Sequence, residues 1–229
     1  MWSRKFSGIL AAVVLLVPAA ADAFDGERKG FLLGFGIGAG AASYTQDLKL
    51  DGFPDRTSSR QTTFAISTNL KVGWGFTDRL LVYYFNNIAW IQHDDVFIYD
   101  NPLTDFKEIF WVFDGFDAPT KTIWIATGLV GVGVTYYLGD NSPYYVTGAG
   151  GLSTWTAPFE DDDWLAPFKD SAQTWFGYSA LVGFGWEFME HWSAEATAMW
   201  GNPGETGSFG LDVTSNTATL LIMVSGLVY

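Results

Sequence analysis

The chain has 229 residues, of which 48% are hydrophobic and 17% aromatic, and its formal net charge is −13. This length fits a single domain. The acidic balance argues against a nucleic-acid partner, because phosphate binding needs clustered lysine and arginine. The absence of cysteine excludes disulfides and thiolate metal sites. The 11 tryptophans are more than a soluble core usually holds, whereas a lipid-facing surface needs aromatic rings at the headgroup level.

Residues 1–23 have the pattern of an export signal. Two basic residues precede an apolar run over 8–17, and a small-residue cleavage site follows at 21–23. The alternative is a membrane anchor, but the apolar run is shorter than the about 20 residues that a helix needs to cross a bilayer. We therefore predict a cleaved signal peptide and a mature chain that begins at Phe24.

Apolar residues then recur at every second position. The clearest segment is 192–200, where one face holds Trp192, Ala194, Ala196, Ala198 and Trp200 and the other holds Ser193, Glu195, Thr197 and Met199. A tilted strand crosses a bilayer in about 9–11 residues with alternate side chains facing lipid. The two tryptophans would lie roughly 20 Å apart along the membrane normal. This spacing predicts one aromatic ring near each edge of an apolar band.

Eight segments share this alternation, and they lie at 31–41, 63–76, 80–92, 122–138, 144–155, 174–188, 192–200 and 217–229. The pattern predicts an all-β fold, a closed antiparallel transmembrane β-barrel of eight strands. Closure pairs every backbone donor and acceptor inside lipid. The alternative is a soluble β-sandwich. It would leave large apolar side chains exposed to water on most strands.

The connections alternate in length. Tight polar turns lie at 77–79, 139–143 and 189–191, and long connections lie at about 44–61, 93–121, 156–173 and 201–216. Outer-membrane barrels have short periplasmic turns and long external loops. We therefore expect residues 24–229 to form one barrel domain with four external loops and both ends on the periplasmic side.

Three local features carry a family resemblance. The strand-turn-strand units over 73–80 and 185–195 look like periplasmic hairpins, and the chain ends in an alternating apolar strand with a terminal aromatic residue, Tyr229. In these features the chain resembles the small outer-membrane β-barrel superfamily, represented by the transmembrane domain of OmpA and by outer-membrane protein X. The resemblance implies a monomer in the bacterial outer membrane, in contact with its lipid and lipopolysaccharide. It also implies that the barrel-assembly machinery reads the last strand.

Some barrels of this kind are lipid A-modifying enzymes, so sets of histidine, serine and acid are candidates for catalysis. His191, Ser193 and Glu195 stand at alternate positions, but at a turn expected on the periplasmic side, away from lipid A in the outer leaflet. Ala194 also replaces the asparagine that would follow the serine in a lipid A deacylase. A polar turn with lumen-facing side chains is the simpler interpretation.

Two further polar groups fall in long connections. His93 precedes two aspartates, an arrangement common in solvated loops, although outer-membrane aspartyl-type proteases use such residues in ten-stranded barrels. The acidic run 160–163 offers oxygen ligands that Ca²⁺ or Mg²⁺ prefer, but no turn spacing aims them at one ion. We predict no catalytic, metal-binding or cofactor-binding residue, and leave cation binding by 160–163 and the role of the aromatic-rich stretch 106–116 open.

The alternation itself predicts two structural sets. Lys71, Glu187 and Glu195 fall on lumen-facing positions, where a buried charge needs a partner, so we predict charge pairing among them. A membrane-interface girdle is predicted at Trp74, Trp186, Trp192, Trp200 and Tyr229.

The function that these patterns favour is an integral outer-membrane protein with a structural or surface-interaction role held in its external loops. The alternative is a passive channel for small solutes, in the manner of porins or OmpW-like barrels. A lipid A-modifying enzyme is the third hypothesis. Architecture alone does not choose among them, because these barrels host many unrelated functions.

Overall fold

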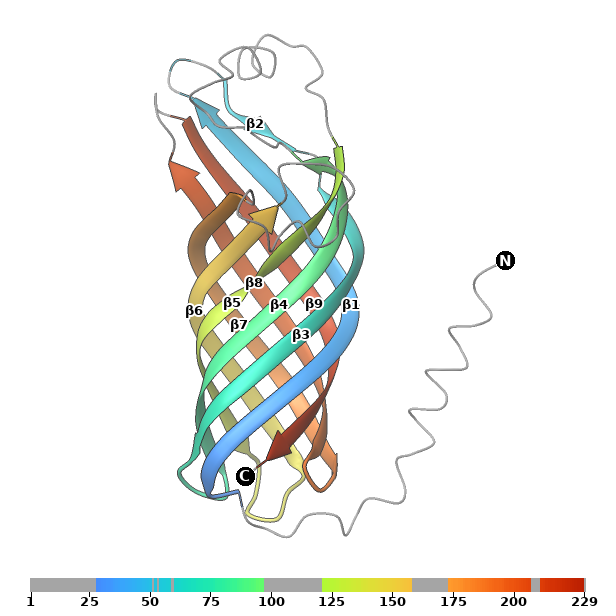
Figure 1. Ribbon diagram of the computed structural model, residues 1–229, viewed down its shortest axis with the longest axis vertical. Coiled ribbons are helices and arrows are strands. Elements are labelled where there is room, and N and C mark those ends of the chain that lie inside the picture. Colours follow the sequence, from blue (N-terminus) through green and yellow to red (C-terminus); the bar gives the residue numbers. More distant parts are fainter. Residues whose placement is uncertain are drawn as a thin grey trace, which may run out of the picture.

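Eight long strands form a closed barrel in the computed structural model, which describes residues 28–50, 52, 54–58, 60–96, 121–157, 173–206 and 211–228. Each strand pairs antiparallel with the next, and the first pairs with the last to close the sheet (Figure 1). A further two-residue strand, β2, pairs with the end of β1. The strands are β1 (Gly30–Leu50), β2 (Arg56–Thr57), β3 (Gln61–Gly75), β4 (Leu80–Val96), β5 (Lys121–Tyr137), β6 (Tyr144–Ala157), β7 (Gln173–Met189), β8 (Trp192–Thr206) and β9 (Leu211–Val228).

The predicted closed antiparallel barrel is confirmed, and the inward and outward faces predicted for 192–200 agree with the burial of the β8 side chains. On β8, Ser193, Glu195 and Thr197 are buried, whereas Trp192 and Trp200 are about half exposed. Successive side chains of a strand point to opposite sides of the sheet. A closed sheet therefore sends one set into the lumen and the other to the outside. No helix among the described residues is long and apolar enough to cross a membrane.

The strands run further than the sequence pattern predicts. β1 continues to Leu50 and β8 to Thr206, so the connections expected at 44–61 and 201–216 are too long. The connections expected at 93–121 and 156–173 are shortened in the same way by β4, β6 and their partners. At about 3.3 Å per residue and a tilt near 40°, a strand as long as β9 rises roughly 45 Å, well beyond an apolar band of about 25 Å.

A row of polar side chains explains why the apolar alternation stops before the strands do. On the outside of β8, β9 and β1, Asn202 donates to Asn216 at 2.7 Å, and Asn216 donates to Asp47 at 3.0 Å. Thr57 of β2 donates to the same aspartate at 2.7 Å. These positions continue the outward faces whose earlier members are apolar, so the backbone ladder goes on after the apolar pattern has ended.

The opposite end of the barrel, the turn end, holds the three tight turns. Arg79 in the first turn forms a two-point ion pair with Asp140 in the second, with N–O distances of 2.5 and 2.8 Å. Its hydrogen bonds lower the pKa of the Asp140 carboxyl. Lys29 lies 2.8 Å from Asp78 and lowers the pKa of that carboxyl likewise. The third turn, at Glu190 and His191, joins β7 to β8.

Candidate functional site: the lumen

An ion pair crosses the lumen between strands that are not neighbours. Lys71 of β3 lies 3.2 Å from a carboxylate oxygen of Glu195 of β8, and both side chains are almost fully buried. The ammonium group also lies 5.4 Å from the ring centroid of Tyr83 and 5.8 Å from that of Phe85. The structure thus brings together two of the three charged residues that the alternation places inside. Each charge has the partner that burial requires.

The third residue, Glu187, pairs with a different cation. It accepts two hydrogen bonds from the fully buried Arg28, at 2.7 and 3.1 Å. The guanidinium group also donates to the backbone carbonyls of Asp78 and Ser142, and it lies 3.4 Å above the centroid of the Tyr137 ring. One side chain thereby ties two turns, β5 and β7 together, and it occupies the lumen at the turn end.

The alternating pattern does not indicate Arg28 as a lumenal residue. The residue precedes β1 and lies outside the alternating run, so the alternation of inward and outward positions does not assign its side chain to either face. Charge balance in the lumen could have indicated this residue. If Lys71 pairs with Glu195, the buried Glu187 carboxylate needs another cation as its partner. Arg28 directly precedes the first strand.

Aromatic rings fill the lumen around these pairs. The Tyr83 hydroxyl is hydrogen-bonded to the hydroxyls of Thr135 and Thr147, at 2.9 and 2.8 Å. Its ring occupies the space beside Gly133, where a Cβ atom would collide with it. The ring of Tyr145 fills the space beside Gly185 in the same way. An eight-stranded barrel has an interior just wide enough for side chains. Inward glycines are therefore matched by large rings here.

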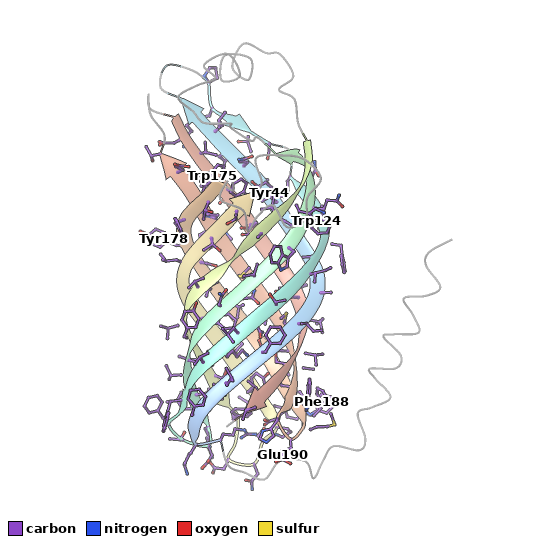
Figure 2. All side chains as sticks on the ribbon, in the orientation of Figure 1. Tyr44, Trp124, Trp175, Tyr178, Phe188 and Glu190 are labelled. Atoms are coloured by element: carbon purple, nitrogen blue, oxygen red, sulfur yellow. The ribbon has the colours of Figure 1, made fainter. Side chains whose placement is uncertain are left out.

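The half of the lumen nearer the long connections, the loop end, is occupied by neutral side chains. Trp155 and Trp175 are buried and stack with ring centroids 3.9 Å apart and planes 10° apart. The Tyr44 hydroxyl lies 3.0 Å from that of Ser215. Figure 2 shows Tyr44 and Trp175 toward this end and Glu190 at the turn end. Midway, Ser67 of β3 donates to Asn87 of β4 at 3.2 Å.

The residues weighed as a catalytic set do not converge. Ser193 and Glu195 are buried in the lumen, whereas His191 lies at the third turn with its Nε2 3.4 Å from the exposed carboxylate of Glu190. The His93 side chain and the stretches 106–116 and 160–163 lie outside the described residues. Within the described ranges, no group of three or more His, Cys, Asp or Glu side chains could hold a metal ion.

The predicted girdle tryptophans lie on the outer surface. Trp74, Trp192 and Trp200 are about half exposed, and Trp186 is partly covered and packs at 5.7 Å from the ring of Phe188. Tyr229 lies outside the described residues. Trp192 begins β8 at the turn end, and Trp200 stands just before the polar row that starts at Asn202.

No protein-family profile and no curated protein sequence matches the chain. Among solved structures, the attachment invasion locus protein Ail of Yersinia pestis is similar at 9% identity, with 84% of this chain and 98% of that chain covered and a TM-score of 0.39. Neisserial surface protein A is similar at 13% identity, with 84% and 96% covered and a TM-score of 0.45. The outer membrane protein OprG from Pseudomonas aeruginosa is similar at 16% identity, with 89% and 99% covered and a TM-score of 0.45.

The chain forms a closed antiparallel barrel of eight long strands, as its sequence pattern predicts. At these low identities and TM-scores, the closed barrel rests on the strand pairing itself, which runs unbroken from β1 round to β9. One architecture can host many unrelated functions, so the activity of this chain has to be argued from its own residues.

Proposed function

We propose that this protein is an integral outer-membrane barrel of a Gram-negative cell envelope, with a structural or surface-interaction role carried by its loop end. The supporting observation is the outward apolar band. Phe35, Val182 and Leu220 are 58%, 65% and 63% exposed, and they belong to three different strands. In water, contiguous apolar surface on this scale promotes aggregation. In a bilayer, it is the surface that lipid covers.

The limits of the band support the same proposal. On β9 the outward positions are apolar from Val228 back to Ala218, and they become polar at Asn216, Thr214 and Asp212. Aromatic rings stand near both limits, at Trp192 and Trp200. A barrel with an apolar belt, aromatic edges and polar strand extensions fits a bilayer and a solvated surface beyond it. Contacts with lipopolysaccharide at the loop end, and recognition of β9 by the barrel-assembly machinery, belong to this proposal.

A passive channel is the second candidate, and the filled lumen argues against it. The two buried ion pairs and the rings around them occupy the turn-end half of the described interior, and the tryptophan stack occupies the loop-end half. A solute would have to displace charges that are already paired. We also propose no enzymatic role, because the His191 side chain lies beside Glu190 in the turn, whereas Ser193 and Glu195 are buried in the lumen.

Cysteine labelling tests location and orientation, because the natural chain has no cysteine. We expect an impermeant maleimide to label Asp161→Cys on intact cells and to label Asn141→Cys only after the outer membrane is permeabilised. Asn141 is exposed in the second turn. The reverse labelling would overturn the orientation, and recovery of the protein in the soluble fraction would overturn the membrane location.

Planar-bilayer recording separates the proposed role from the channel. Purified protein should insert without producing stepwise conductance. Reproducible unitary steps from the wild-type protein, absent from a preparation purified identically without it, would favour the channel instead.

A further inference from the structure

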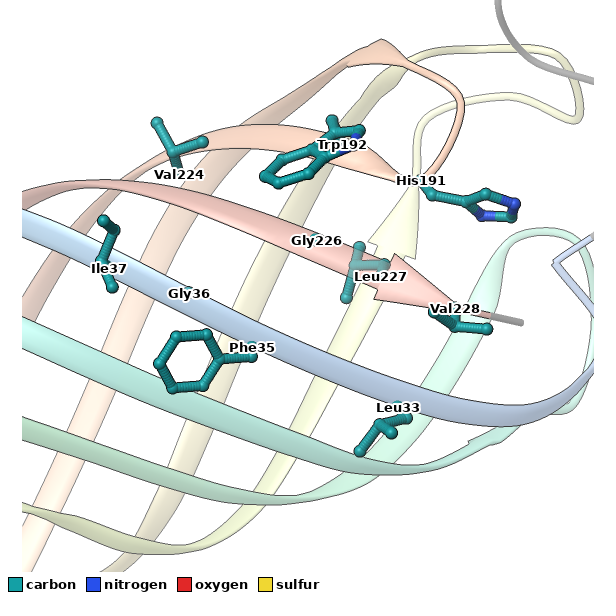
Figure 3. A pocket seen from close by; sticks show the side chains of 10 residues that line it. All are labelled: Leu33, Phe35, Gly36, Ile37, His191, Trp192, Val224, Gly226, Leu227 and Val228. Atoms are coloured by element: carbon teal, nitrogen blue, oxygen red, sulfur yellow. The ribbon is translucent and has the colours of Figure 1, made fainter.

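A hollow lies on the outer surface where the barrel closes, near the turn end. Phe35 of β1, Gly226 of β9 and Trp192 of β8 form one cross-strand row, because Gly226 is the partner of both other residues. The middle member of this outward row has no side chain. Val224 and Val228 stand before and after it on β9, and all five residues line the hollow (Figure 3). We call this feature the Gly226 hollow.

Neither the backbone nor the packing requires glycine at position 226. Positive φ is found at Gly30 and Gly52 among the described glycines, and not at Gly226. A Cβ atom there would meet the Trp192 ring at 3.9 Å, which is ordinary contact. At the inward Gly36, by contrast, a Cβ atom would collide with the side chains of Ser225 and Asn69. A Cβ atom is therefore tolerated at position 226, and the outer face of β9 is open there because glycine carries none.

The shape and position of the hollow suit a single hydrocarbon chain. Neighbouring strands lie about 4.8 Å apart, so the backbones that carry Phe35 and Trp192 are separated by roughly 10 Å. Their side chains flank Gly226 and line the hollow, with the Trp192 ring beside the glycine. The exposed Leu33 and Ile37 of the apolar band line the same hollow. In a bilayer, the hollow would be filled by a lipid tail.

Polar groups stand at the turn-end rim of the hollow. His191 lines it and carries a φ of 64°, the one positive φ among the described non-glycine residues. The carboxylate of Glu190 lies 3.4 Å from the imidazole, and both side chains are substantially exposed. An ammonium group would complement this carboxylate, and a phosphate would accept a hydrogen bond from the imidazole. An anionic headgroup that lacks an ammonium group would be repelled by the Glu190 carboxylate.

We propose that the Gly226 hollow seats one acyl chain of a phospholipid whose ethanolamine headgroup lies at Glu190 and His191. This inference rests on the proposed membrane location and adds a lipid class and a position to it. The lipid would occupy the leaflet at the turn end, across the β1–β9 closure.

Filling the hollow tests the acyl-chain site. Gly226→Leu would place a side chain over the Trp192 ring without entering the lumen. Gly148→Leu is the matched control, because it adds the same side chain to the outer face of β6, where the nearest atom to a Cβ lies 3.8 Å away. Each protein is refolded from urea, and its binding of dioleoyl phosphatidylethanolamine is titrated by native mass spectrometry. We expect roughly threefold or greater weakening for Gly226→Leu alone.

The controls keep the two proposals separate. Equal binding by the wild type and by Gly226→Leu would overturn the acyl-chain site while leaving the membrane location intact. Failure of the wild type to fold into vesicles would overturn the membrane location itself. If Gly226→Leu fails to refold, Gly226→Ala gives a smaller obstruction, with a smaller loss of binding expected and an unchanged affinity contradicting the site.

The preference of the protein for one lipid headgroup over another tests whether Glu190 and His191 bind the headgroup. The wild type should bind phosphatidylethanolamine more tightly than phosphatidylglycerol, and Glu190→Gln should reduce that ratio toward one while leaving Gly226 open. His191→Asn should weaken both lipids, because asparagine tolerates positive φ but lacks the imidazole. An unchanged ratio in Glu190→Gln would overturn the headgroup assignment.

Discussion

The two halves of the lumen are closed by different chemistry. The turn-end half holds two buried ion pairs, Arg28 with Glu187 and Lys71 with Glu195. The loop-end half holds a neutral stack of Trp155 on Trp175. Removing one member of a buried ion pair leaves an uncompensated charge, whereas removing a neutral contact costs packing or one hydrogen bond. The turn-end half should therefore be the more sensitive to single substitutions.

The largest expected effect is at Glu195. Glu195→Ala leaves the Lys71 ammonium buried without a carboxylate, so we expect a loss of about 3–5 kcal/mol in the free energy of unfolding. Urea-dependent unfolding in lipid vesicles measures this loss. The double variant Lys71→Met with Glu195→Leu removes both charges and should recover most of it. If the double variant is no more stable than Glu195→Ala, the unpaired Lys71 charge is not the cause of the loss.

A smaller effect is expected in the loop-end half. Tyr44→Phe removes the hydroxyl that lies 3.0 Å from Ser215 and keeps the ring in place. The same unfolding measurement should show a loss of about 1 kcal/mol, the usual contribution of one buried hydrogen bond. A loss as large as that of Glu195→Ala would abolish the distinction between the two halves.

The smallest effect is expected outside the lumen, at the exposed pair of Arg79 and Asp140. The folded-state pKa of Asp140 is lowered, so its contribution to stability is present above the ordinary value of 3.8 and is lost as the pH falls through the lowered pKa. Asp140→Asn should therefore reduce the loss of stability between pH 6 and pH 3, by less than the effect of Tyr44→Phe because solvent screens this pair. Urea midpoints at the two pH values measure it. An unaltered pH dependence in the variant would show that the pair contributes nothing.

The part of the barrel that carries the apolar band was predictable from the sequence because one rule governs it. An apolar outer face and a narrow lumen require alternate residues to differ, and the run from Trp192 to Trp200 shows this directly. The same rule placed Lys71 and Glu195 in the lumen, where the structure pairs them. Tight turns were recognisable because they are short and polar.

The strand extensions, the role of Arg28 and the Gly226 hollow were not predictable, because the alternation rule does not apply to them. Beyond the apolar band both faces of a strand can be polar. For this reason the sequence pattern predicted a loop where β1 continues past Ser43. Arg28 lies before the first strand, where the alternation gives no information, so the sequence placed Glu187 in the lumen without indicating the cation that pairs with it. The Gly226 hollow depends on which residues become cross-strand neighbours, and that requires the register of β1, β8 and β9.

Arginine at two depths of one strand tests directly whether the outer face of the barrel meets lipid. Ala196 and Thr206 are both exposed on the outer face of β8, one midway between Trp192 and Trp200 and the other beyond the polar row. Ala196→Arg should lower the free energy of unfolding in vesicles by about 2–4 kcal/mol, because it places a charge near the bilayer midplane. Thr206→Arg should change it by less than about 0.5 kcal/mol. Equal tolerance of arginine at both positions would contradict the account, because a water-exposed barrel would show the same small effect at each.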